Sequence, residues 1–164
     1  MAHVKGESRT TLPTDEFIGR LESLYGEIER WLRGTNLTLR RGRVTISEES
    51  IPRYIAPNLS IHNPEGHELA SLSPVGRRIL GAEARVDLVG AYGSRPILYL
   101  SPGGPSLATR IQEGRQVLET HARPLFPGVG REGWYTVDQR RPRAHILDGA
   151  SLRELVRKVS DHVI

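Results

Sequence analysis

The chain has 164 residues, enough for one domain with a hydrophobic core that needs no metal or disulfide to support it. It is 37% apolar and 26% charged, as ordinary globular proteins are, and no apolar stretch approaches the roughly 18 residues of a membrane span. The net charge of +4 is modest for a nucleic-acid-binding protein, and the absence of cysteine excludes disulfides, cysteine-ligated zinc and thiol catalysis. Because the first residues are polar and carry no signal-peptide pattern, we expect a cytoplasmic protein with no membrane segment.

The first half of the chain opens on a polar segment and an amphipathic helix. Residues 1–13 show no periodicity and predict a flexible N-terminal arm, followed by a single globular domain over 14–164. Thr14 is placed to cap a helix over 15–33 that Gly34 would end. The apolar positions of this helix form a wide stripe, made of Phe17, Ile18, Leu21, Leu24, Tyr25, Ile28, Trp31 and Leu32. Such a stripe packs into a core, and its excess width also allows a partner to bind.

A run of short strands follows this helix. Alternating apolar residues on either side of Arg41 and Gly42 predict a hairpin that joins 36–40 to 43–47. Alternation and turn signals predict further strands at 54–61, 67–72, 84–89, 97–100, 134–138 and 144–147. The spacing of Leu107, Ile111 and Leu118 predicts a helix over 106–121, followed by a loop rich in proline and glycine.

The last segment is a second amphipathic helix. Ser151 and Glu154 have the spacing of a capping box, which predicts that the helix begins there. A helix, a run of strands and a final helix, without regular βαβ alternation, predict a single α+β domain. We expect a largely antiparallel sheet, curved or barrel-like, with an N-terminal and a C-terminal amphipathic helix.

Three residues are weak candidates for catalysis or metal binding. His62 and His67 carry good metal ligands, but five positions and a Pro-Glu-Gly turn separate them, which favours an exposed turn over a helical zinc site. Asp87 is a charged residue in an otherwise apolar strand, and Arg85 on the same face offers it an ion pair. We therefore expect no metal site and no cofactor.

Arginine carries almost all of the positive charge, because Lys5 and Lys158 are the only lysines. Two clusters are predicted to be exposed turns that contact a partner: Arg40, Arg41 and Arg43, and Arg140, Arg141 and Arg143, the second beside Trp134 and Tyr135. Guanidinium groups bind carboxylates and phosphates in a bidentate manner, and neighbouring aromatics can stack on bases. A codon bias or thermal adaptation would produce the same composition, and this alternative stays open.

The sequence contains no nucleophile elbow, no phosphate-binding loop and no known nucleic-acid module. We therefore expect a non-enzymatic binding or accessory subunit that docks onto a larger partner protein with an acidic surface. One alternative is a sequence-tolerant nucleic-acid-binding protein that uses the arginine turns. The other is a small metal-dependent hydrolase that uses His62, His67 and Asp87. The identity of the partner and the oligomeric state stay open.

Overall fold

The structure is a computed structural model that describes residues 13–79, 82–104, 106–113, 116–124, 126–138 and 140–164. The predicted flexible arm lies, apart from Pro13, outside these residues. In chain order the elements are α1 (Pro13–Trp31), β1 (Thr38–Ile46), β2 (Tyr54–His62), β3 (Glu68–Ile79), β4 (Ala82–Gly90), β5 (Gly93–Leu100), β6 (Ser106–Glu113), β7 (Gln116–Pro124), β8 (Gly133–Val137), β9 (Ala144–Ile146) and α2 (Gly149–Ser160). Neither α1 nor α2 is long and apolar enough to cross a membrane.

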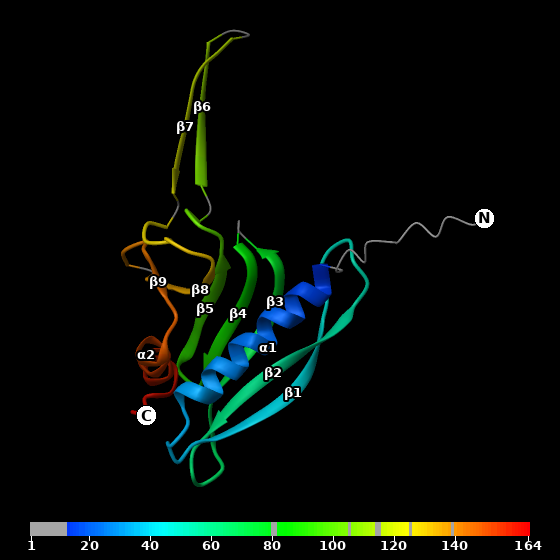
Figure 1. The fold of residues 1–164 in the computed structure, drawn as a ribbon, viewed down its shortest axis with the longest axis vertical. Coiled ribbons are helices and arrows are strands. Elements are labelled where there is room, and N and C mark those ends of the chain that lie inside the picture. The colour runs from blue at the N-terminus through cyan, green and yellow to red at the C-terminus, as the bar shows by residue number, and fades with distance from the viewer. Residues whose placement is uncertain (1–12, 80–81, 105, 114–115, 125, 139) are drawn as a thin grey trace, which may run out of the picture.

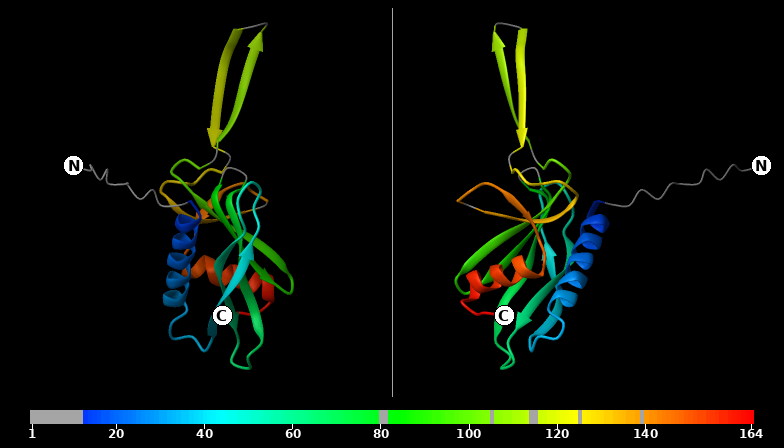
Figure 2. Two further views of the ribbon diagram at one scale, coloured as in Figure 1. Left: turned by 90° about the vertical axis from the view of Figure 1, so that its right-hand side faces the viewer. Right: turned by 60° about the vertical axis from the view of Figure 1, so that its left-hand side comes forward.

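Seven strands form one antiparallel sheet in the order β1-β2-β3-β4-β5-β8-β9. β6 and β7 form a separate hairpin that projects away from the body (Figures 1 and 2). The α+β class and the antiparallel arrangement are therefore confirmed. The barrel-like alternative is wrong, because within the described chain β1 and β9 each pair with a single strand and the sheet stays open. The chain leaves β9 after three residues and forms α2, and among the described residues no strand joins β9 to β1.

The main core lies between the two helices and one face of the sheet. The helices contribute side chains that are almost fully buried, among them Phe17, Leu21, Leu24, Tyr25, Ile28, Leu152, Val156 and Val159. The sheet contributes Ala56, Leu59, Ile61, Leu72, Val86, Leu88 and Ile97. A smaller cluster lies around Leu98, Leu100 and Tyr135, beneath the loop that carries Val129. The buried Tyr25 donates its hydroxyl to the Pro57 carbonyl at 2.9 Å, which fixes α1 over β2.

The wide stripe of α1 is used by the core. Six of its eight apolar residues are buried, and only Ile18 and Trp31 are half-buried. The helix begins at Pro13 rather than after a cap at Thr14. Proline is favoured in the first turn of a helix, because the backbone N–H that it lacks would have no helical partner there. The chain leaves the helix through Gly34, whose φ of 83° is the left-handed conformation that glycine adopts without strain.

β1 is one continuous strand where the sequence predicts a hairpin. It pairs with β2 along its whole length without a register shift. Leu39, in the first half of β1, and Val44, in the second half, both pack against the core. The inward-facing positions therefore change from odd to even residue numbers along the strand. A Cβ on Gly42 would lie 2.5 Å from Asn58 Oδ1, so the glycine allows a close approach of β2. The predicted hairpin is wrong, because the chain does not reverse at Gly42 and the break in alternation falls inside one continuous paired strand.

The helix predicted over 106–121 is also wrong. The segment forms β6 and β7, which pair from Ser106 opposite Pro124 to Glu113 opposite Gln116. Leu107, Thr109 and Ile111 also alternate with period two, and this pattern competes with the helical spacing over so short a stretch. Gly114, which weakens a helix, falls in the sequence between the two strands.

The C-terminal helix begins three residues earlier than its predicted capping box. Asp148 is the N-cap residue, and its carboxylate accepts a hydrogen bond from the backbone N–H of Ser151 at 2.8 Å. The Ser151 hydroxyl in turn accepts from the backbone N–H of Asp148 at 2.8 Å. The predicted Ser151–Glu154 box is therefore wrong in register, because an aspartate upstream offers a better acceptor and leaves Ser151 in the third helical position.

Candidate functional site

The described chain has a groove of about 610 Å³ between α1 and the β8 side of the sheet. One wall is the face of α1 that carries Arg20, Glu27 and Trp31. The opposite wall comes from β5, β8 and β9 and includes Tyr99, Trp134 and Ile146. A volume of this size is within the usual range for a ligand pocket.

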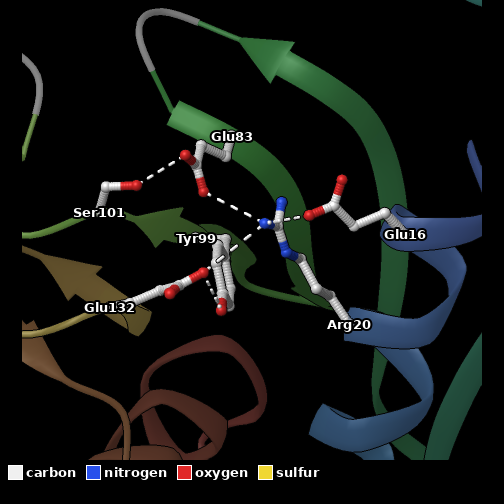
Figure 3. Close-up of polar contacts among 6 residues, drawn as sticks. All are labelled: Glu16, Arg20, Glu83, Tyr99, Ser101 and Glu132. Atoms are coloured by element: carbon white, nitrogen blue, oxygen red, sulfur yellow. Dashed lines mark hydrogen bonds and ion pairs between the residues drawn. The ribbon is translucent and has the colours of Figure 1, made fainter. Parts of the chain in front are cut away.

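Arg20 is the centre of a polar network at one end of this groove (Figure 3). Its Nη2 atom lies 2.9 Å from Glu16, 3.4 Å from Glu83 and 3.6 Å from Glu132. These carboxylates belong to α1, to β4 and to the segment just before β8. The guanidinium also lies 4.2 Å from the centre of the Tyr99 ring, which places it in cation–π geometry.

Two hydroxyl groups hold the carboxylates of this network in place. Tyr99 donates to Glu132 at 2.8 Å, and Ser101 donates to Glu83 at 2.6 Å. Burial and the hydrogen bond to Glu132 raise the pKa of Tyr99 to about 12, so the phenol keeps its proton at neutral pH. The ring of Tyr99 also packs edge-on against Trp134 at a centroid distance of 5.2 Å. Hydrogen bonds and aromatic packing therefore position Tyr99 and the two carboxylates on the sheet side of the groove.

Sequence reasoning missed this network. Glu16 and Arg20 have the i, i+4 spacing of a helical ion pair, and that spacing is the only local signal. Glu83, Tyr99 and Glu132 come from distant parts of the chain, and only the sheet topology brings them together. No pattern in the sequence announces their convergence.

A second surface, rich in cationic side chains, lies at the C-terminal end of β8. Arg95, Arg140, His145 and Lys158 line a pocket of about 650 Å³ together with Asp138. They come from four different elements: β5, the β8–β9 turn, β9 and α2. Hydrogen bonds from the backbone N–H groups of Arg140 and Arg141 lower the pKa of Asp138, so its carboxylate is ionised and supports the turn.

The two predicted arginine turns differ in the structure. Arg140, Arg141 and Arg143 are exposed in the β8–β9 turn, as their prediction requires. Arg40, Arg41 and Arg43 lie along the edge strand β1 and not in a turn, although they too are exposed. Arg41 is engaged within the molecule: it pairs with Glu22 and with Glu29, the latter at 2.7 Å, both on α1.

The aromatic residues predicted beside the second arginine cluster point into the protein. Tyr135 is 2% exposed and Trp134 is 9% exposed. The Tyr135 hydroxyl donates to the Arg131 carbonyl at 2.6 Å, inside the smaller core. Neither ring presents an exposed face beside Arg140 on which a nucleic-acid base could stack.

The three weak catalytic candidates do not converge. His62 is buried, with Nε2 2.9 Å from the Ser60 hydroxyl and Nδ1 3.3 Å from the Gly66 carbonyl, so both ring nitrogens are engaged inside the β2–β3 hairpin. His67 is exposed in the turn of that hairpin. Asp87 lies two strands away and forms a two-point ion pair with Arg85 at 2.8 and 3.1 Å. In the part of the chain that the structure describes, no three acidic or histidine side chains gather as a metal site would require.

Comparison of the chain with known protein families, with curated proteins and with solved structures found no significant match. The functional conclusion therefore depends on the chemistry of these surfaces.

Proposed function

We propose that this protein is a non-enzymatic binding subunit of the cytoplasm that docks onto a larger, acidic-surfaced protein. The contact surface consists of Arg95, Arg140, His145 and Lys158, which line one pocket, and of the exposed Arg141 that follows Arg140 in the turn; it is called here the basic surface. One observation carries the proposal: cationic side chains from separate elements converge on one pocket. Among the described residues, none of Arg95, Arg140 and Lys158 has a carboxylate within 4 Å.

What distinguishes this surface is the convergence of its cations, because single arginines without a carboxylate partner, such as Arg33 and Arg53, also occur elsewhere among the described residues. Arg20, Arg41, Arg77, Arg85 and Arg157 each have a carboxylate partner. The basic surface carries more positive than negative charge, since Asp138 is the one carboxylate among the residues that line its pocket, and an acidic partner would relieve the remaining repulsion. Such complementarity acts mainly on the rate of association and on the choice of partner.

The burial of Trp134 and Tyr135 favours a protein partner over nucleic acid, because base stacking needs exposed rings. Exposed arginines can still contact phosphates without stacking. The two classes of partner are therefore compared directly in the test.

Binding to poly-L-glutamate and to a single-stranded oligonucleotide of equal charge is measured for the parent protein at several salt concentrations. The same measurement is made for a double variant, Arg140→Ser with Lys158→Ser. The control is Arg33→Ser with Arg53→Ser, which removes the same charge from exposed positions outside the basic surface. We expect the first variant to bind polyglutamate roughly tenfold more weakly and the control to bind almost as the parent does. Equal loss in both variants would contradict the proposal, and tighter binding of the oligonucleotide would favour the nucleic-acid alternative.

A further inference from the structure

We propose that the edge strand β1 binds an extended acidic segment of a partner protein, which adds to the sheet as a further strand. This inference concerns the edge of the sheet and does not depend on the basic surface, whose residues come from β5, β9, α2 and the β8–β9 turn.

The first argument is the length and regularity of this edge. Among the described residues β1 pairs with β2 alone, so its other side has no strand beside it (Figure 1). The strand is nine residues long, contains no proline and pairs with β2 without a register shift, whereas β9 at the opposite edge has only three residues. Exposed edges of natural sheets are usually short or interrupted by proline or a bulge, because an unpaired edge accepts another strand. β1 has none of these interruptions.

The second argument is the charge along this edge. Leu39 and Val44 pack against the core. Because side chains alternate along a strand, the neighbouring Arg40 and Arg43 project from the opposite face. Both arginines are exposed, neither has a carboxylate within 4 Å among the described residues, and the β2 residues opposite them are uncharged. A strand added on the free side would place acidic residues beside both arginines, and opposite charges on facing strands stabilise a sheet.

The third argument is the other face of β1. Leu39 and Val44 are only half-buried, so apolar residues on an added strand would cover them and extend the core. Arg41 already pairs with Glu22 and Glu29 of α1 and needs no further acid. The segment that fits both faces is therefore one in which acidic and apolar residues alternate.

The arginines also decide between a partner and a second copy of this chain. Two β1 strands side by side would bring the arginines of one copy against those of the other, and like charges on facing strands destabilise a sheet. The charges on β1 therefore protect the edge against its own copy and leave it open to an acidic strand.

The probe is the blocked peptide Val-Glu-Val-Glu-Val-Glu-Val with a fluorescent label. One control is Val-Val-Glu-Glu-Glu-Val-Val, which keeps the composition and charge without the alternation. The other control is the first peptide with every interior backbone nitrogen methylated, which removes the donors that strand pairing needs. We expect saturable binding of the first peptide and binding about tenfold weaker, or weaker still, for both controls. Equal binding of the methylated peptide would overturn the proposal, because charge alone would then account for it.

Hydrogen exchange locates the bound peptide. The amide hydrogens of Thr38–Ile46 that point away from β2 should exchange more slowly once the peptide supplies carbonyl partners. Binding that leaves exchange in β1 unchanged would overturn the proposal. Protection of β1 that rises with protein concentration in the absence of peptide would overturn it too, because a second copy would then occupy the edge.

A pair of double variants separates this edge from the basic surface. Arg40→Ser with Arg43→Ser should weaken binding of the alternating peptide roughly three- to tenfold, since it removes both cross-strand charges. Arg140→Ser with Lys158→Ser removes the same charge from the basic surface and should leave this binding unchanged. The opposite pattern would place the peptide on the basic surface, which would overturn this inference and leave the proposed function standing.

Discussion

Individual side chains decide where α2 begins. Asp148 and Ser151 exchange two hydrogen bonds at the first turn, and each removes one unpaired donor. Replacing Asp148 with alanine should therefore lower the free energy of unfolding by about 1 kcal/mol, measured by urea denaturation. The variant Asp148→Asn keeps a good capping acceptor and should lose less. An unfolding curve for Asp148→Ala that matches the parent would contradict the assignment of the cap.

The same carboxylate has a pH dependence with a defined sign. The hydrogen bond from the backbone N–H of Ser151 lowers the pKa of Asp148 in the folded protein. Its contribution to stability is therefore complete above the usual aspartate pKa and is lost as the pH falls through the lower, folded value. The difference in unfolding free energy between the parent and Asp148→Ala should shrink at low pH, and a constant difference would argue against this cap.

At the scale of the elements, alanine substitutions at two glycines should change the stability of the protein in opposite directions. Gly90 lies beneath α2, and a Cβ there would clash with the carbonyl oxygen of Val159, which is backbone and cannot move aside. Gly90→Ala should destabilise the protein by about 1–3 kcal/mol. Gly26 lies within α1 with no atom within 4 Å of an added Cβ, so Gly26→Ala should stabilise it by roughly 0.5–1 kcal/mol. Thermal melting of both variants checks the pair, and a shift of the same sign in both would count against the packing of α2.

The projecting hairpin is expected to be dispensable for the body of the fold. An isolated two-stranded hairpin contributes little stability of its own. A Cβ on Gly104 would lie 3.8 Å from the Phe126 carbonyl oxygen, so a short Gly-Ser linker can replace residues 105–125 without strain. The shortened protein should melt cooperatively within about 4 °C of the parent. Loss of a cooperative transition would show that β6 and β7 support the sheet.

At the scale of the whole molecule, local patterns predict the fold class better than the sites. The stripe from Phe17 to Leu32 identifies α1 because helical periodicity is strong over 19 residues. The predicted hairpin at Arg41 is wrong because a change of parity in the apolar pattern is compatible with both a turn and a continuous strand. The predicted helix over 106–121 is wrong because the short apolar spacing there is compatible with both a helix and strands. The Arg20 network brings together residues as far apart in the sequence as Glu16 and Glu132, which are 116 positions apart. No short stretch of sequence therefore contains the network.

The most direct measurement replaces Arg140, in the basic surface, with a photo-crosslinking amino acid in the native host. Glu65, in the β2–β3 turn, receives the same replacement as a control. We predict a crosslinked product at position 140 that resists nuclease, contains a larger acidic protein and is absent at position 65. A product that nuclease removes, or equal products at both positions, would contradict the proposal that this surface docks onto a protein partner.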